Sequence, residues 1–325
     1  GAYNRISQLP KSQLERGVIT ASAGNHAQGV ALSGQKLGIR AIIVMPKTTP
    51  DIKVQAVKRL GGDVVLHGDS FDVANKYAIQ RAKDEGMTFI PPYDDELVMA
   101  GQGTIGNEIL RQWRDVDYVF VAVGGGGLIG GVAAYLGDVA PHVKVIPVEY
   151  DESACLKAAF EAGERVVLPS VGLFADGTAV AQIGEKPFEV IQLMKSDNSG
   201  PIVEREVVLV NTDEICAAIK DTYDECRSIV EPSGAMALAG IKKYVAEHGL
   251  ENKNLVSIVC GANMNFDRLR YIAERTELGE RKEAIFAVTI PEEKGSFLNF
   301  CRALQGRNIT EFNYRASHSS AAQVF

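Results

Sequence analysis

The segment DYVFVAVGGGGLIGGVAAY, Asp117–Tyr135, decides the fold class. It begins with a β-branched and aromatic run, continues with four consecutive glycines, and ends in small apolar residues with helical spacing, which predicts a strand, a tight turn and a helix. Four glycines cost chain entropy, and bare N–H groups before a helix can bind an anion. We interpret Gly124–Gly127 as an anion-binding loop, with a flexible connection as the alternative.

Similar pairs of strands and helices surround this segment. Apolar runs at 41–46, 64–68 and 143–149 alternate with helical patterns such as those at 25–36 and 71–86. Alternating strands and helices are typical of a mostly parallel sheet covered by helices on both faces, so we predict an α/β fold. After about residue 284 the pattern changes to β-α-β followed by a further strand, which indicates a separate small α+β module.

Composition narrows the possible partners. The formal net charge is −7 without a block of basic residues, so we expect no nucleic acid and no anionic membrane surface as a partner. No apolar stretch reaches the length of about 18 residues that spans a bilayer. Five scattered cysteines without CxxC pairs favour a reducing, intracellular compartment and argue against structural zinc or another metal site.

The glycine loop fits two kinds of anion. Gly125, Gly127 and Gly130 match GxGxxG, and Glu149 follows 24 residues after the first of them, which resembles a dinucleotide fingerprint. An NAD-binding oxidoreductase is therefore one hypothesis. No lysine follows the glycines as in a Walker motif, and the loop would equally hold the single phosphate of pyridoxal phosphate.

Four more segments place small or polar residues at strand ends and helix starts. Asn25 lies in TASAGNHAQGVA, either as an N-cap or as a ligand-binding side chain. Cys260 ends a strand, Glu231 precedes a small-residue helix as a candidate cap, and Gln102 lies in a predicted glycine-rich bend. Ligands of open α/β sheets bind at this edge of the sheet.

Five motifs carry a resemblance to a known family. SAGNHAQG, AGQGT, VGGGGL, VEPSGA and CGANMNFDRLR, in this order, resemble the threonine ammonia-lyases, pyridoxal-phosphate enzymes of the fold type shared with the tryptophan synthase β subunit. The resemblance covers about residues 1–315. VTIPEEKGSF and TEFNYR, in the region from about residue 284, resemble the start of the ACT-like regulatory domain of the biosynthetic form.

The resemblance implies fold type II, with two domains of mostly parallel sheets. The large cofactor-binding domain would comprise 1–14 and 98–280, the small catalytic domain 15–97, and a truncated ACT-like module 284–325. The implied reaction is β-elimination of water from L-threonine, with some activity on L-serine, giving 2-oxobutanoate and ammonia in the first step of isoleucine biosynthesis. The site residues alone do not separate this enzyme from a serine racemase or a catabolic dehydratase.

The resemblance also implies roles for individual residues. Asn25 would bind the ring oxygen of the cofactor, and Cys260 would face its pyridine nitrogen, where most members have serine. Ser22 would handle a proton near the leaving hydroxyl, whereas His26 would shape its loop rather than catalyse. The phosphate would be held by Gly124, Gly125, Gly126, Gly127 and Leu128. The substrate carboxylate would be held by Ser22, Ala23, Gly24, Asn25 and His26.

One residue of the family pattern is expected outside the sequence. The lysine that binds the cofactor as a Schiff base lies in a K-x-R-G-A-Y motif, and this chain begins with GAYN, so the lysine would lie three residues before Gly1. We therefore interpret the chain as a fragment that is itself inactive. The family further implies a tetrameric homo-oligomer, isoleucine as feedback effector, and a cytoplasmic, mitochondrial or plastid location depending on the source.

Overall fold

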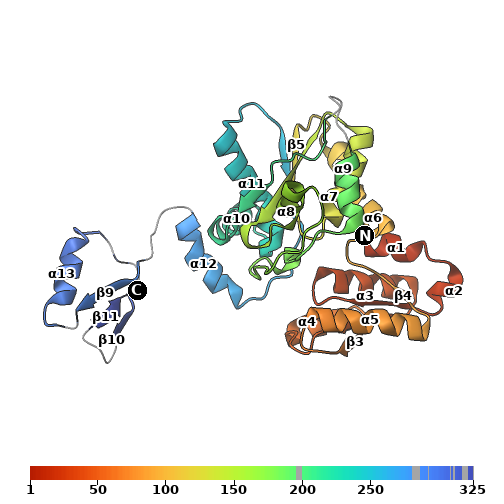
Figure 1. Ribbon diagram of the computed structural model, residues 1–325, viewed down its shortest axis with the longest axis horizontal. Helices are drawn as coiled ribbons and strands as arrows, with labels where there is room; N and C mark the ends of the chain where they lie inside the picture. The colour runs from red at the N-terminus through yellow and green to blue at the C-terminus, as the bar shows by residue number, and fades with distance from the viewer. Residues whose placement is uncertain are drawn as a thin grey trace.

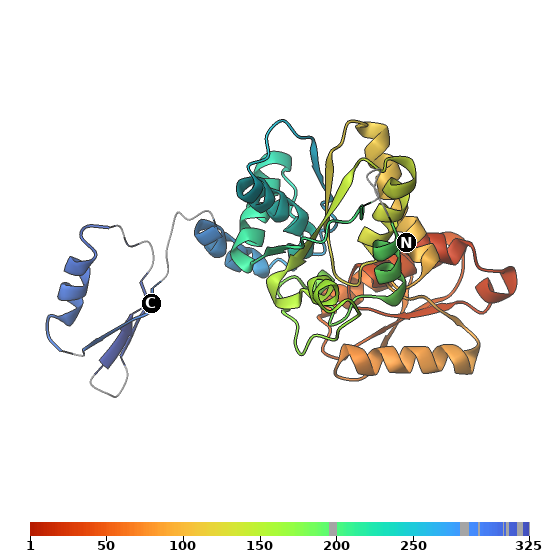
Figure 2. The same cartoon turned by 45° about the horizontal axis from the view of Figure 1, so that its top comes forward.

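The computed structural model describes residues 1–194, 200–279, 286–291, 293–307, 309, 312–316 and 321–324. Two four-stranded sheets form the main body, and all strand pairs in both are parallel. The predicted α/β class with parallel sheets is therefore confirmed. Figures 1 and 2 show the two sheets with their helices side by side, and a smaller C-terminal unit apart from them.

The first sheet has the strand order β3-β2-β1-β4. Its strands are β1 (Val18–Ala21), β2 (Ala41–Met45), β3 (Asp63–Leu66) and β4 (Thr88–Phe89). The helices around it are α1 (Ala2–Ser7), α2 (Lys11–Leu14), α3 (Asn25–Leu37), α4 (Asp51–Arg59) and α5 (Phe71–Glu85). Because side chains alternate along a strand, Ile43 and Met45 pack under α3 and α4, while Ile42 and Val44 pack under α5. Both faces are thus buried.

The second sheet has the order β7-β6-β5-β8. Its strands are β5 (Tyr118–Ala122), β6 (Lys144–Tyr150), β7 (Val208–Val210) and β8 (Leu255–Ser257). One face is covered by α6 (Glu96–Gln112), α7 (Gly127–Val139), α8 (Cys155–Ala162) and α9 (Glu185–Leu193). The other is covered by α10 (Thr212–Cys226), α11 (Pro232–His248) and α12 (Arg268–Gly279). Two short 3-10 helices, η1 (Asp151–Ser153) and η2 (Asp176–Thr178), lie in the connections.

The glycines around Gln102 do not form a bend. They lie inside α6, which crosses α7 at close range, and a Cβ on Gly103 would be 2.8 Å from the carbonyl oxygen of Gly131. A Cβ on Gly131 would be 2.9 Å from the nitrogen of Gly103 and closer still to the carbonyl oxygen of Met99. The predicted bend was wrong because these glycines allow two helices to approach, rather than turning the chain.

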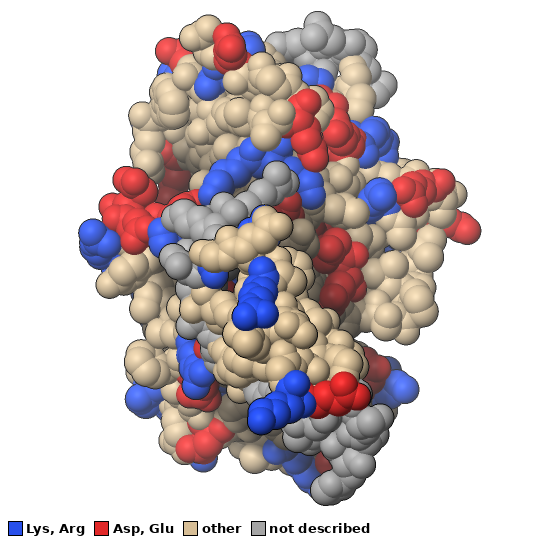
Figure 3. Space-filling model, turned by 90° about the vertical axis from the view of Figure 1, so that its left-hand side faces the viewer, with Lys and Arg blue, Asp and Glu red and all other residues tan. Residues whose placement is uncertain are grey.

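The C-terminal unit has the predicted order of elements. It contains β9 (Val288–Pro291), α13 (Ser296–Ala303), β10 (Tyr314–Ala316) and β11 (Ala321–Val324), with the antiparallel sheet order β10-β11-β9. On the face of the molecule that Figure 3 shows, acidic and basic side chains are interspersed, with no large region of one charge. Among the described residues, no helix combines the length and apolarity needed to cross a bilayer.

Candidate active site

The predicted site residues follow the carboxyl ends of three strands. The turn Ser22–Gly24 follows β1, the glycine loop Gly124–Gly127 follows β5, and Cys260 lies three residues beyond β8. The first of these strands belongs to one sheet and the other two to the second sheet. A direct contact between Asn25 and Glu231 joins the two edges.

The glycine loop is built for close approach. Gly126 has φ +85°, and a Cβ on it would lie 2.8 Å from Pro187, while a Cβ on Gly124 would lie 2.8 Å from the Cα of Thr178. The loop ends at the N-terminus of α7. Within the described residues, the N–H groups of Gly124–Gly127 have no hydrogen-bond acceptor. Unpaired N–H groups at a helix start form an anion-binding cradle.

Asn25 is not an N-cap. It is the first residue of α3, the N-cap is Gly24, and no side chain caps this helix. The Asn25 Nδ2 instead donates to Oε1 of Glu231 at 2.7 Å. The Asn25 amide makes this charge-assisted hydrogen bond and does not cap the helix. The capping interpretation was therefore wrong, and the ligand-binding alternative remains.

Glu231 occupies the N-cap position of α11, as the sequence indicated, but its side chain does not cap the helix. The side chain accepts instead from Asn25 and from the Asn263 N–H at 2.9 Å. The residue is 4% exposed, and burial raises the pKa of its carboxyl group while the two hydrogen bonds oppose that change. A carboxylate at this depth needs partners, which only the folded chain supplies.

Cys260 keeps its proton near neutral pH. Desolvation by the surrounding chain, together with the neighbouring Glu231 carboxylate, raises the pKa of its thiol to about 11, although the residue as a whole is exposed to solvent. The thiol donates from Sγ to the carbonyl oxygen of Ser233, at the start of α11, over 3.8 Å. Ser233 in turn contacts Thr178, whose backbone packs against Gly124. Ser233 and Thr178 were not predicted, and they connect the Cys260 segment to the glycine loop.

Ser22 and His26 shape the turn before α3. The Ser22 Oγ accepts from the Gly24 N–H at 3.2 Å, which fixes the turn and leaves the hydroxyl proton free to be donated. Burial lowers the pKa of the His26 imidazole to about 4, so the ring is neutral at pH 7. Because a carbonyl oxygen only accepts, the Nε2 of His26 carries the proton that it donates to Ile90 at 3.0 Å.

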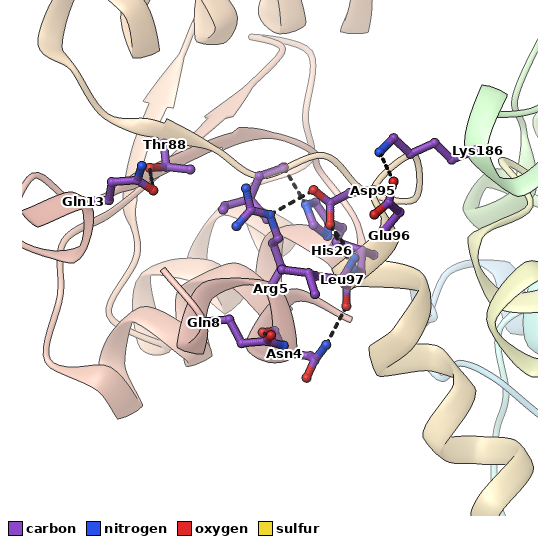
Figure 4. Close-up of polar contacts among 12 residues, drawn as sticks. Asn4, Arg5, Gln8, Gln13, His26, Thr88, Asp95, Glu96, Leu97 and Lys186 are labelled. Atoms are coloured by element: carbon purple, nitrogen blue, oxygen red, sulfur yellow. Dashed lines mark hydrogen bonds and ion pairs between the residues drawn. The ribbon is translucent and has the colours of Figure 1, made fainter. Parts of the chain in front are cut away.

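The N-terminal helix is fixed beside the start of α6. Arg5 forms an ion pair with Asp95 at 2.9 Å, and the Asn4 Nδ2 donates to the carbonyl oxygen of Leu97 at 2.7 Å (Figure 4). A Cβ on Gly101 would lie 2.9 Å from the Cα of Gly1. Since α1 also packs on α3, it joins the two sheet units at their boundary.

Glu149 does not behave as a ribose ligand. Its fully buried carboxylate accepts from the backbone N–H groups of Leu156 at 2.7 Å and Lys157 at 2.9 Å, at the start of α8. Both oxygens are therefore occupied by the protein. The dinucleotide-binding hypothesis is not favoured, because the carboxylate that it requires for the ribose is hydrogen-bonded to the N-terminus of α8.

Two known families match the chain. The family described as pyridoxal-phosphate dependent enzyme matches residues 1–261, and the C-terminal regulatory domain of threonine dehydratase matches residues 274–325.

Individual relatives give the same result. The biosynthetic L-threonine dehydratase of Salmonella typhimurium is 53% identical over 325 residues, which are all of this chain and 62% of that protein. The chloroplastic threonine dehydratase 1 of Solanum lycopersicum is 53% identical over 97% of this chain and 51% of its own. The chain thus spans less than two thirds of the length of these relatives.

Solved structures share the fold. Processed threonine deaminase isoform 2 from Solanum lycopersicum superposes with a TM-score of 0.81 at 49% identity, covering 85% of this chain and 74% of that one. Maize serine racemase superposes with a TM-score of 0.74 at 30% identity, covering 87% and 83%.

The site residues fit the cofactor of this family. The unpaired N–H groups of Gly124–Gly127 suit a phosphate, and a Cβ at these positions would fill the space. Asn25 and Cys260 offer an amide and a neutral thiol. With the match over residues 1–261, these features lead to one conclusion: the chain belongs to the family of pyridoxal-phosphate dependent enzymes.

Proposed function

We propose that the protein containing this chain dehydrates and deaminates L-threonine to 2-oxobutanoate and ammonia, the first step of isoleucine biosynthesis. The observation that carries the proposal is the extent of the similarity. Identity to biosynthetic threonine dehydratases runs through the whole chain, and residues 274–325 match their regulatory domain. L-Serine is a second proposed substrate, because it also carries a β-hydroxyl group.

We assign the cofactor contacts to three groups of residues. The N–H groups of Gly124–Gly127 and of Leu128 hold the phosphate, Asn25 binds the ring oxygen, and Cys260 faces the pyridine nitrogen. When bound, the cofactor supplies the electron-withdrawing ring that makes the Cα proton of an amino acid acidic.

The thiol of Cys260 limits how strongly the ring withdraws electrons. With a pKa of about 11, the thiol is a weak acid and does not transfer its proton to a pyridine nitrogen near pH 7. A carboxylate at this position would keep the ring protonated and stabilise a long-lived carbanion. Cys260 therefore suits elimination, in which the β-hydroxyl leaves at once.

We place the substrate carboxylate at the start of α3. In the described chain the N–H groups of Ala23, Asn25 and His26 have no acceptor, whereas that of Gly24 is used by Ser22. A Cβ on Gly24 would meet nothing within 4 Å, so there is space for a ligand. The free hydroxyl proton of Ser22 is the one we assign to the leaving hydroxyl, because the Nε2 proton of neutral His26 is already donated to the Ile90 carbonyl oxygen.

Three further assignments belong to the same proposal. The lysine that binds the cofactor is proposed three residues before Gly1, in the K-x-R-G-A-Y motif of the family. Isoleucine is the proposed feedback effector, acting through the regulatory domain that residues 274–325 begin. We propose a homotetramer as the assembly.

The test is a product assay with the full-length protein. Purified with pyridoxal phosphate, it should form equal amounts of 2-oxobutanoate and ammonia from L-threonine, none from D-threonine, and pyruvate from L-serine. Added isoleucine should lower the rate at limiting threonine, and light scattering should give the mass of four subunits. Formation of D-serine from L-serine without 2-oxobutanoate from threonine would instead identify a racemase and contradict the proposal.

A further inference from the structure

Two polar contacts cross between the helices of the first sheet and the loops of the second. Asn25, on α3, donates to Glu231 at 2.7 Å, and the Nζ of Lys53, on α4, lies 2.9 Å from Oδ2 of Asp176. The two contacts are adjacent, because a Cβ on Gly177 would be 3.2 Å from Oε1 of Glu231. Glu231 therefore lies at the boundary of the two units, beside the residues assigned to the cofactor.

Each oxygen of the Glu231 carboxylate has a different partner. Oε1 accepts from Asn25, and Oε2 accepts from the backbone N–H of Asn263 at 2.9 Å. Asn263 belongs to the segment that carries Cys260, so one carboxylate connects the two side chains assigned to the cofactor ring. The backbone N–H of Glu231 also donates to the Gly261 carbonyl oxygen at 3.0 Å, which fixes Glu231 to the same segment.

The carboxylate determines how the Asn25 amide is turned. An ionised carboxylate only accepts, so the end of the amide that meets it must be Nδ2. That nitrogen has two hydrogens, and Glu231 uses one of them. In the part of the chain that the structure describes, no other contact of the Asn25 side chain is recorded, which leaves its second N–H for a ligand.

We propose that Glu231 is a positioning residue: its carboxylate fixes the Asn25 amide so that one N–H remains for the ring oxygen of the cofactor. The inference rests on the proposed role of Asn25. A purely structural Glu231 would hold only the segment from Gly261 to Asn263, and its loss would then act independently of Asn25.

A double-mutant cycle separates the two roles. Glu231→Gln keeps the size of the side chain but replaces one oxygen by an NH₂ group, which faces either the Asn25 amide or the Asn263 N–H. Four full-length proteins are compared: wild type, Asn25→Ala, Glu231→Gln and the double variant. The dissociation constant of pyridoxal phosphate and the absorption maximum of the bound cofactor are measured without any amino acid.

When Asn25 is present, Glu231→Gln should raise the dissociation constant of the cofactor about tenfold, because a hydrogen bond to a charged group contributes a free energy of this size. In the Asn25→Ala background the same substitution should raise it less than about twofold. It should also shift the absorption maximum only when Asn25 is present. Equal weakening in both backgrounds would overturn the proposal. Glu214→Gln is the matched control, since Glu214 also accepts a backbone N–H, that of Asn211 at 2.8 Å, and its partners Asn211 and Lys243 are not assigned to the cofactor.

A second variant decides the question if Glu231→Gln does not fold. The titratable groups facing Glu231 are Asp176, Lys53 and Cys260, and the Lys53 charge favours its ionised form. Protonation would turn one acceptor oxygen into a donor facing an N–H group, so cofactor affinity should fall on the acid side. Lys53→Met should move that fall to higher pH when Asn25 is present and not in the Asn25→Ala background, and the same profile change in both backgrounds would overturn the proposal.

Lys242→Met is the control for this second variant. Lys242 forms a similar pair with Asp221 at 2.6 Å, and neither residue is among the charged groups that act on Glu231, so its removal should not move the profile. Because all these measurements omit the substrate, they test Glu231 separately from the proposed reaction. A protein that binds the cofactor as expected but yields no 2-oxobutanoate would contradict only the proposed function.

Discussion

The substitution Gly125→Ala tests whether the glycine loop holds the cofactor phosphate. A Cβ on Gly125 would lie 2.5 Å from Cδ2 of the Tyr93 ring, and closer still to Cγ and Cδ1. Ordinary contact begins at 3.4 Å, so the added methyl group overlaps the ring by about 1 Å. Either the ring or the loop has to move.

The surroundings of Tyr93 oppose movement of the ring. A Cβ on Gly127 would be 2.8 Å from the Cβ of Tyr93, so the tyrosine packs along the loop. The following residues are fixed, because Asp94 accepts from the Lys186 N–H at 2.9 Å and Asp95 caps α6. Overpacking of such a site costs about 1–3 kcal/mol. The loop must therefore shift, and its N–H groups lose their common direction.

Two assays measure the consequence. Urea unfolding without cofactor should show the loss of about 1–3 kcal/mol, and titration should show pyridoxal phosphate binding weakened at least about tenfold, since each 1.4 kcal/mol is a factor of ten. Gly137→Ala in α7 is the control, because its Cβ would meet Met194 at 3.5 Å without overlap. It should increase stability by up to about 1 kcal/mol. Wild-type stability and affinity in Gly125→Ala would refute the reasoning.

Three further predictions follow from individual contacts. Burial raises the pKa of Glu149 from 4.5 to about 7. Between these pH values the folded state keeps a proton that the unfolded chain has lost, so the free energy of unfolding should fall by roughly 3 kcal/mol as the pH rises from 4.5 to 7. Urea titrations of Glu149→Gln at several pH values should show a flatter profile, and an identical slope would contradict the assignment. Asn211→Ala should lower the stability by about 1 kcal/mol, because the capping box with Glu214 is lost, whereas exposed Gln55→Ala should change it little. Cys260 is exposed, so access of the reagent does not limit its labelling. Because the pKa of its thiol is raised to about 11, it should still react with iodoacetamide at pH 8 on the order of 100-fold more slowly than a thiol of ordinary pKa, as followed by peptide mass spectrometry. Labelling at the rate of an ordinary thiol would contradict the raised pKa.

The sequence by itself determined the features that depend on near neighbours along the chain. Alternating apolar runs and helical patterns predicted the parallel sheets. The capping box joins Asn211 and Glu214, which are only three residues apart. The four glycines predicted a turn between β5 and α7. Each of these features arises within a few residues, through hydrogen bonds or periodicity that the order of residues fixes.

Only the tertiary structure decided which groups meet over long distances in the chain. Asn25 and Glu231 are 206 residues apart, and each looked like a helix cap because its partner was not visible in the sequence. The position of Glu149 in the sequence fitted a nucleotide fingerprint, but in the structure its carboxylate accepts from the backbone N–H of Leu156 at the start of α8. Polar side chains satisfy whichever donor or acceptor lies nearest in space, and burial makes that pairing obligatory, so their partners follow from packing and not from spacing.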